Sequence, residues 1–209
     1  MAKKVSLVLA LTLFSLGAYA MFWPFQKYDV EMSPEVRGVI KLDGVPQSGL
    51  TISRELFYEG YKKGQTILED TQTNEQGEFS FPAMTIRSRL PGDIFGGSLK
   101  VYQQISVECQ SEKKEIWGVW APTEGAKSLR WMLTHINCEL SNSKRVHEVD
   151  ISPVEERLVP VHSICDWNSP SINTYVYDQS TDTYVRYKKT PQPLESIFNA
   201  KHRVKLDAE

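Results

Sequence analysis

The stretch Thr71-Gln-Thr-Asn-Glu-Gln-Gly-Glu-Phe-Ser-Phe-Pro82 changes from a polar half to a half in which aromatic and polar residues alternate, with Gly77 at the join. A phosphate-binding glycine loop would lead into a helix, whose N-terminus holds the anion. Here the glycine precedes an alternating strand instead. We therefore predict a hairpin loop at residues 74–77, with Gly77 at positive φ. Phe79 and Phe81 should then lie on one face of the strand.

A second patterned stretch lies upstream, Val36-Arg-Gly-Val-Ile-Lys-Leu-Asp-Gly-Val-Pro-Gln-Ser-Gly-Leu-Thr-Ile52. It reads as a strand with an inner glycine, the turn sequence D-G-x-P-x-x-G, and an alternating strand. Gly44 can take positive φ, and Pro46 fixes φ as the chain leaves the turn. Further short β-like runs, at residues 99–109 and 115–120, are separated by charged and turn-forming residues. Spacing of this kind favours a β-sandwich over a helical fold.

Together, the two stretches resemble the carboxypeptidase-regulatory-like, or transthyretin-like, β-sandwich superfamily, through the D-G-x-P-x-x-G turn and a following T-x-x-x-G-x-F. More narrowly, residues 33 to about 140 are similar to an uncharacterised family of gammaproteobacterial proteins known only as a domain of unknown function. Residues 56–62 and 137–142 add to that narrower similarity. The resemblance implies a mainly β fold, with a transthyretin-like (prealbumin-like) antiparallel β-sandwich over residues 33–140. It implies no catalytic residue, since members of the superfamily serve as accessory modules, carbohydrate binders, adhesin stalks and carriers.

The pattern weakens in the C-terminal third of the chain. Residues 126–133 place three apolar side chains at helical spacing, which predicts a short helix: Leu129, Met132 and Leu133. Residues 174–177 and 183–187 are rich in β-branched and aromatic residues, and the polar turn formers between them predict a β-hairpin. We expect residues 141–209 to form a less regular extension that contains this hairpin and packs on or beside the sandwich.

The N-terminus has the three parts of a secretory signal peptide: lysines at positions 3 and 4, an apolar run, and the A-x-A sequence Ala18-Tyr19-Ala20. We expect residues 1–20 to be removed and the folded part to be periplasmic or secreted. Two alternatives stay open. Residues 22–25 extend the apolar run to about the 20 residues that a membrane-spanning helix needs, so the signal could be kept as an anchor. Translation from Met21 would instead leave a cytoplasmic protein.

The net charge of the chain indicates which classes of partner to expect. With 24 basic against 26 acidic residues, the formal net charge is −2, which gives no electrostatic reason to bind nucleic acid. We expect contact with a membrane only if the signal is uncleaved.

Two H-x-x-C elements, His135-Ile-Asn-Cys138 and His162-Ser-Ile-Cys165, are the sharpest candidates for chemistry. Two nitrogens and two thiolates could form a tetrahedral zinc site. In an oxidising compartment, however, thiols are more often joined as disulfides. We therefore expect no metal and no cofactor, and we keep a metal-dependent protein or enzyme that uses His135, Cys138, His162 and Cys165 as the alternative function.

The three cysteines permit one disulfide. Cys109 follows two apolar residues on one face of a predicted strand, so we interpret it as a buried small hydrophobic residue. Cys138 and Cys165 lie in less regular segments, where a covalent link stabilises most. We predict the disulfide Cys138–Cys165, which would tie the C-terminal extension to the sandwich.

Aromatic side chains are the remaining candidates for a binding surface. Several of them could form a stacking platform or simply pack in the core: Phe57, Tyr58, Tyr61, Trp117 and Trp120. Trp117 and Trp120 are three residues apart and should face opposite ways on a strand. We select Phe95, in the loop of residues 87–97, Trp120 and Tyr177 as candidate binding residues.

No activated nucleophile is evident in the sequence, because Gly96-Gly-Ser98 lacks the closing glycine of a nucleophile elbow. The sequence thus favours a non-enzymatic exported envelope protein that binds a protein or glycan through loops and exposed aromatic residues. A protein of the immunity or inhibitor type is one variant of this class.

Overall fold

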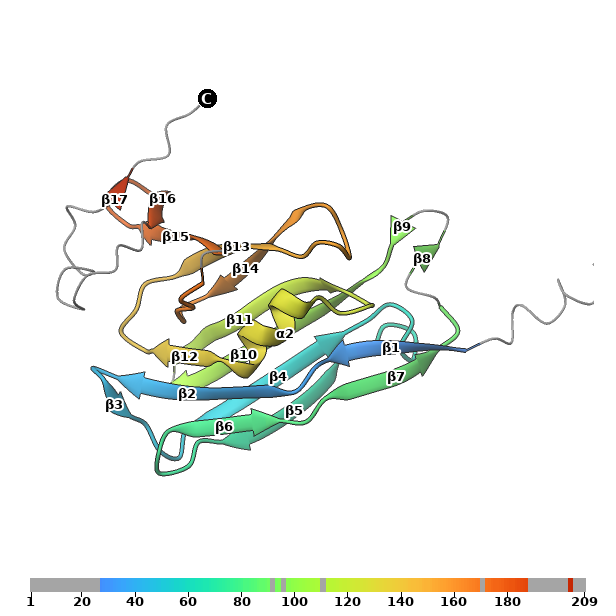
Figure 1. The fold of residues 1–209 in the computed structure, drawn as a ribbon. Helices are drawn as coiled ribbons and strands as arrows, with labels where there is room; N and C mark the ends of the chain where they lie inside the picture. The colour runs from blue at the N-terminus through green and yellow to red at the C-terminus, as the bar shows by residue number, and fades with distance from the viewer. Residues whose placement is uncertain are drawn as a thin grey trace, which may run out of the picture.

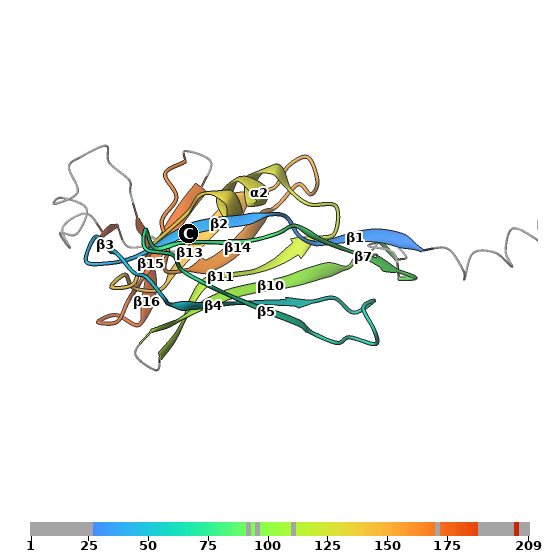
Figure 2. The same cartoon turned by 90° about the horizontal axis from the view of Figure 1, so that it is seen from below.

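The computed structural model describes residues 27–90, 93–94, 97–109, 112–169, 172–187 and 203–204. This part of the chain is mainly β with one short helix, and its strands form two facing layers (Figure 1, Figure 2). The predicted mainly β, antiparallel sandwich is therefore confirmed. The expected signal peptide, residues 1–20, and the candidate binding residue Phe95 lie outside the described residues.

The large layer is a nine-stranded antiparallel sheet with the order β17-β16-β15-β13-β14-β11-β10-β4-β5. Its strands are β4 (Thr51–Phe57), β5 (Ile67–Gln72), β10 (Lys100–Cys109), β11 (Glu112–Pro122), β13 (Arg145–Asp150), β14 (Leu158–Ser163), β15 (Ile172–Asp178), β16 (Thr183–Tyr187) and β17 (Arg203–Val204). The predicted C-terminal hairpin is formed by β15 and β16. Strands β13 to β17 thus extend the sheet that β4, β5, β10 and β11 begin.

The small layer is built around β2 (Val36–Leu42). Strands β3 (Val45–Pro46) and β6 (Glu78–Phe81) pair with β2 in antiparallel orientation, and β12 (Ile136–Glu139) pairs with it in parallel. A ribbon of β1 (Tyr28–Ser33) and β7 (Met84–Ser88) lies beyond them, and β8 (Asp93–Ile94) pairs with β9 (Gly97–Ser98). The tight turn from β2 to β3 has positive φ at both Asp43 and Gly44, 52° and 78°, as a type I′ hairpin requires.

The stretch of residues 71–82 does not form the predicted hairpin. Strand β5 pairs with β4 in the large sheet, whereas β6 pairs with β2 in the small sheet, so the chain crosses between the layers here. The turn itself is as predicted, since Gly77 has φ 71° and its N–H donates to the Asn74 carbonyl at 2.9 Å. Phe79 and Phe81 are both buried, as expected. The crossing lets this aromatic face cover the core opposite the large sheet, which a hairpin within one sheet would not allow.

The main core fills the space between the layers and is also covered by helix α2 (Lys127–Thr134). As predicted, the helix buries Leu129, Met132 and Leu133. The side chain of Arg54 on β4 is also fully buried. Its Nε donates to the Glu69 carboxylate at 2.9 Å and its Nη1 to the Pro82 carbonyl at 2.9 Å. The guanidinium also lies 4.7 Å from the centre of the Phe81 ring. The charge is therefore paired, as a buried charge must be.

A disulfide joins Cys138 on β12 to Cys165, just beyond β14, the same two cysteines that we expected to pair. The disulfide links the small layer to the large one next to a buried aromatic pair, Trp117 and Trp167, whose ring centres are 6.0 Å apart. Cys109 is half-buried rather than buried, because it is the last residue of β10, where the strand leaves the core.

Candidate functional site

The outer face of the large sheet is the candidate binding surface among the described residues. The small layer and helix α2 cover the inner face of this sheet, while no further layer of described residues covers strands β4, β5, β10 and β11 on the other side (Figure 2). Alternate residues of a strand point to opposite faces, so each strand presents every second side chain on this open surface.

Three aromatic side chains cross this face in one row, which we call the aromatic row. Phe57 on β4 is paired in register with Tyr102 on β10, and Tyr102 is paired with Trp120 on β11. The Tyr102 and Trp120 rings are 5.0 Å apart between centres, and Phe57 meets Trp120 edge to face at 6.4 Å. Trp120 is 53% exposed, while Phe57 and Tyr102 are half-buried. The rings of Tyr102 and Phe57 therefore support the indole ring of Trp120, which remains exposed to solvent.

A polar row lies next to the aromatic row, two residues along each strand. Its register runs from Glu55 on β4 to Gln104 on β10, Gly118 on β11 and His162 on β14. Glu115 also belongs to it, since its side chain lies over Gly118 and its Oε1 accepts a hydrogen bond from Gln104 Nε2 at 3.0 Å. A Cβ atom on Gly118 would overlap the Glu115 carboxylate. The missing side chain of Gly118 thus makes the space in which this carboxylate rests.

A hollow of about 330 Å³ opens between β11 and β14, beside both rows. It forms because these two strands pair in register only at Gly118 and His162. Pro160, which lines the hollow, has no N–H to donate to a neighbouring strand. The walls are Tyr102 and Trp120 on one side and residues 157–160 on the other, where Leu158 is 49% exposed.

Charged side chains of both signs, Glu115 and Arg157, line the hollow. Burial raises the pKa of the Tyr102 hydroxyl, and the nearby carboxylates of Glu115 and Glu55 raise it further. Arg157, which also lines the hollow, forms an ion pair with Glu155, and Glu155 also pairs with Lys100. The carboxylates of Glu115 and Glu55 thus lie close to the aromatic row.

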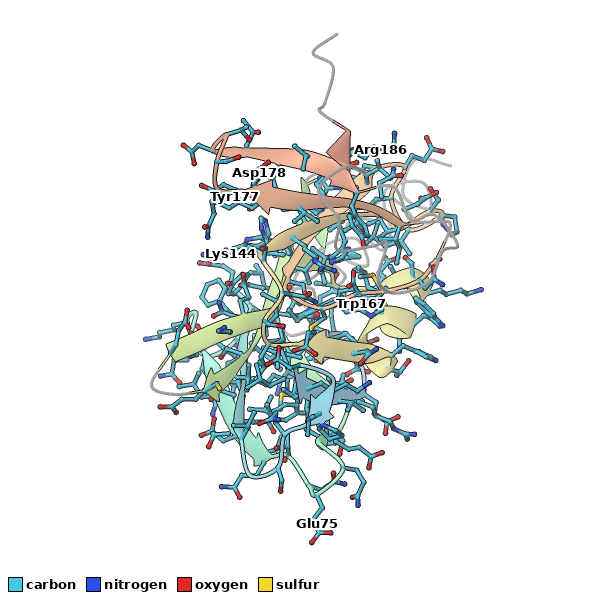
Figure 3. All side chains as sticks on the ribbon, turned by 90° about the vertical axis from the view of Figure 1, so that its left-hand side faces the viewer. Glu75, Lys144, Trp167, Tyr177, Asp178 and Arg186 are labelled. Carbon is cyan, nitrogen blue, oxygen red and sulfur yellow. A yellow bond between two sulfur atoms is a disulfide. The ribbon has the colours of Figure 1, made fainter. Side chains whose placement is uncertain are left out.

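The outer face continues from the hollow to the C-terminal hairpin. A second hollow of about 350 Å³ shares Glu115 and His162 with the first and reaches Tyr184 on β16. Tyr184 packs against Tyr177 on β15, with ring centres 5.4 Å apart, and the Tyr177 hydroxyl donates to Asp182. Figure 3 shows Tyr177 and Lys144 at this end of the molecule, and the Tyr177 N–H donates to the Lys144 carbonyl at 3.0 Å. The structure thus places Trp120 and Tyr177 on one open face.

Other aromatic residues of the predicted platform belong to the core. Trp117 is fully buried, so the two tryptophans of β11 face opposite ways, as their spacing predicted. Tyr58 is also fully buried, and its hydroxyl donates to the Leu90 carbonyl at 2.9 Å. Sequence reasoning did not select Tyr102, Glu115 or Gly118. Only the register of β10 and β11 brings these residues together around Trp120.

The two H-x-x-C elements are not arranged as a zinc site. The Cys138 and Cys165 sulfurs are bonded to each other, which removes both thiolates. His135 stacks on Trp131 at the end of α2, with ring centres 4.9 Å apart, while His162 lies on the outer face of the large sheet. Among the described residues, no group of three or more His, Cys, Asp or Glu side chains is placed to hold a metal ion.

A further depression of about 810 Å³ lies on the opposite side of the molecule, over β2, β6 and the start of β12. Most of its lining is polar or charged, with Arg37 paired to Glu35 at 2.7 Å and Asn74 bonded to Glu78 at 3.0 Å. Arg37 is thus already paired with a carboxylate, and the ring of Phe79, which also lines the depression, is buried. We therefore rank it behind the outer face of the large sheet.

Comparison with known proteins gives a family but no activity. Residues 36–143 match the family model described as Domain of unknown function (DUF6795). No curated protein and no solved structure matches the chain significantly. In the part of the chain that the structure describes, no helix is long and apolar enough to cross a membrane.

Proposed function

Because this chain belongs to the family of the domain of unknown function DUF6795, whose description assigns no activity, we propose a function from the geometry of the outer face. The protein is a non-enzymatic exported protein of the cell envelope that binds a protein or glycan partner. The partner covers the aromatic row and the hollow beside it.

The exposed indole of Trp120 is the observation that carries this proposal. A tryptophan that is 53% exposed, supported by two further rings and next to a hollow, leaves a large apolar area in water. Aromatic anchors of this kind dominate the energetics of protein interfaces and stack on apolar or planar groups. With Leu158 also exposed across the hollow, the surface has an apolar centre and a polar margin, as binding surfaces do.

Two observations support export. The N-terminal sequence has the parts of a secretory signal, ending in Ala18-Tyr19-Ala20. The disulfide between Cys138 and Cys165 is of the kind that persists in oxidising compartments.

The binding role is tested with two matched tryptophan variants. Trp131 on α2 is 40% exposed, but it stacks on His135 and lies outside the outer face, so Trp131→Ala is the control for Trp120→Ala. The exported protein is immobilised and exposed to an envelope extract and to an array of glycans. We expect Trp120→Ala to weaken binding at least tenfold, since loss of a central anchor costs about 2 kcal/mol or more. Trp131→Ala should bind like the wild type.

Binding that survives Trp120→Ala unchanged would show that the outer face is not the binding surface. Equal losses in both variants would point to a general effect of removing tryptophan. Circular dichroism and thermal melting of the free variants separate either result from misfolding.

A further inference from the structure

The hollow between β11 and β14, which we call the Trp120 hollow, is lined by two aromatic rings and by the Glu115 carboxylate. Glu115 accepts a hydrogen bond from Gln104 Nε2 at 3.0 Å, and among the described residues no lysine or arginine pairs with it. Glu55, in the same polar row, likewise has no ion pair within the described part of the chain. Both carboxylates lie close enough to Tyr102 to raise the pKa of its hydroxyl, after the larger effect of burial.

Aromatic faces beside carboxylates have a defined preference among ligands. The faces of Trp and Tyr rings attract cations, and a partly desolvated carboxylate attracts a guanidinium or ammonium group strongly. A neutral sugar would stack on Trp120 as well, but it would leave the charge of Glu115 without compensation. A carboxylate or phosphate ligand would be repelled by the Glu115 carboxylate.

We infer that the Trp120 hollow holds a basic side chain, an arginine or lysine, presented by a protein partner. The cationic group lies against the Trp120 and Tyr102 rings and bonds the Glu115 carboxylate, while the apolar stem of the side chain contacts Leu158. Arg157 also lines the hollow but is already paired with Glu155, so Glu115 is the lining carboxylate that a cation from a partner can reach. This inference rests on the proposed binding role of the outer face and narrows its partner to a protein with an exposed basic segment.

The absence of a side chain at Gly118 determines where the Glu115 carboxylate lies. The carboxylate of Glu115 occupies the space that a side chain at position 118 would fill, so it lies flat on the sheet. Because the overlapping atoms are the end of a flexible side chain, Gly118→Ala should move this carboxylate without disturbing the strand. The variant thus keeps the charge of Glu115 and changes only its position.

The probe is a tetra-arginine peptide, and its matched control is a tetra-citrulline peptide, which has nearly the same shape without the charge. Binding is followed by the indole N–H resonance of Trp120 and by titration calorimetry. We expect tetra-arginine to bind at least tenfold more tightly than tetra-citrulline. Glu115→Gln and Trp120→Ala should each weaken tetra-arginine binding at least tenfold, and Gly118→Ala should weaken it by a smaller factor.

The matched protein control is Glu75→Gln. Glu75 is an exposed glutamate in the turn of residues 74–77, at the opposite end of the molecule from Tyr177 (Figure 3). The substitution removes the same charge far from the hollow, so it should leave the affinity for tetra-arginine unchanged. An equal loss in Glu75→Gln and Glu115→Gln would mean that only the net charge attracts the peptide, and the inference would be wrong.

The remaining outcomes separate this inference from the proposed function. If a neutral oligosaccharide binds at Trp120 and tetra-arginine does not, the basic side chain is excluded and the binding role of the outer face stands. If neither probe shifts the Trp120 resonance, and capture from the envelope extract is also independent of Trp120, both proposals fail.

Discussion

Replacing Gly77 with alanine perturbs the turn at which the chain crosses between the two layers. Gly77 has a φ of 71°, and a Cβ atom there would lie 2.6 Å from the Ile40 carbonyl oxygen and 3.1 Å from Gln47 N. The nearest atom belongs to the backbone of β2 and cannot rotate away, so the turn or the strand must move. Two hydrogen bonds meet at this point: Ile40 N–H donates to the Gly77 carbonyl at 2.9 Å, and Gln47 N–H donates to the Ile40 carbonyl at 3.0 Å.

The loss of stability can be estimated from the backbone strain at position 77 and from the two hydrogen bonds. A residue with a side chain in the left-handed region costs about 1 kcal/mol relative to glycine. Displacing the turn puts both hydrogen bonds at risk, at about 1 kcal/mol each. We therefore expect Gly77→Ala to lower the free energy of unfolding by about 3 kcal/mol, the sum of these terms. For a domain of this size, the melting temperature should fall by roughly 6–12 °C.

Gly49→Ala is the matched control. Gly49 has nearly the same φ, 73°, but a Cβ atom there would meet no atom within 4 Å. Gly49→Ala should therefore lower the free energy of unfolding only by the cost of a side chain in the left-handed region, about 1 kcal/mol. Urea unfolding of both variants, followed by tryptophan fluorescence, measures the difference. If Gly77→Ala is no less stable than Gly49→Ala, the contact with β2 does not constrain the turn and the reasoning is refuted.

Two further predictions concern the disulfide and one carboxylate. The double variant Cys138→Ser, Cys165→Ser should lower the free energy of unfolding by about 3.5 kcal/mol in urea titrations, because the unfolded chain loses a cross-link over a sequence separation of 27 residues. Burial alone would raise the pKa of Glu139, but hydrogen bonds from the amides of Gly44, Asp43 and Ser141 and from the Ser141 hydroxyl hold it below its ordinary value of 4.5. The contribution of Glu139 is therefore present above pH 4.5 and lost as the pH falls through the lower folded value, so wild type should lose stability on acidification more steeply than Glu139→Gln.

Each of these two predictions has an outcome that contradicts it. A reductant should destabilise wild type and leave the double cysteine variant unchanged, and a reductant effect that persists in the variant would implicate something other than this disulfide. For Glu139, whose carboxylate accepts the Asp43 N–H at 2.8 Å and the Gly44 N–H at 2.9 Å, parallel acid profiles of wild type and Glu139→Gln would exclude the turn as the source of the acid sensitivity.

Local patterns predicted the elements of this fold because they depend on neighbouring residues. The turn at Gly77, the helix that buries Leu129 and the C-terminal hairpin all follow from spacing and turn chemistry within about ten residues. The same patterns did not predict that β5 and β6 lie in different sheets, since the sequence of a turn does not specify which strands its flanks pair with.

In the candidate site, too, local sequence predicted some features, and strand pairing decided the others. The three-residue spacing of Trp117 and Trp120 predicted that one of them would be exposed, and Trp120 is the exposed one. Its neighbours could not be predicted in this way. Tyr102 comes from another strand, and the register of β10 and β11, with its bulge near Ile105, decides which side chains stand beside Trp120.

The sequence by itself determined a mainly β chain and the turn at Gly77, because each depends on residue type and short spacing. It also predicted the disulfide Cys138–Cys165, because Cys109 falls on the apolar face of a predicted strand and the other two cysteines lie in less regular segments. The tertiary structure alone decided that the chain crosses between layers after β5 and that no second layer of described residues covers the outer face of the large sheet. It also set the Glu115 carboxylate, which has no cationic partner among the described residues, in the hollow that Trp120 lines. These features arise from strand register and from which faces cover one another, and both are fixed only when segments far apart in the chain bury a common core.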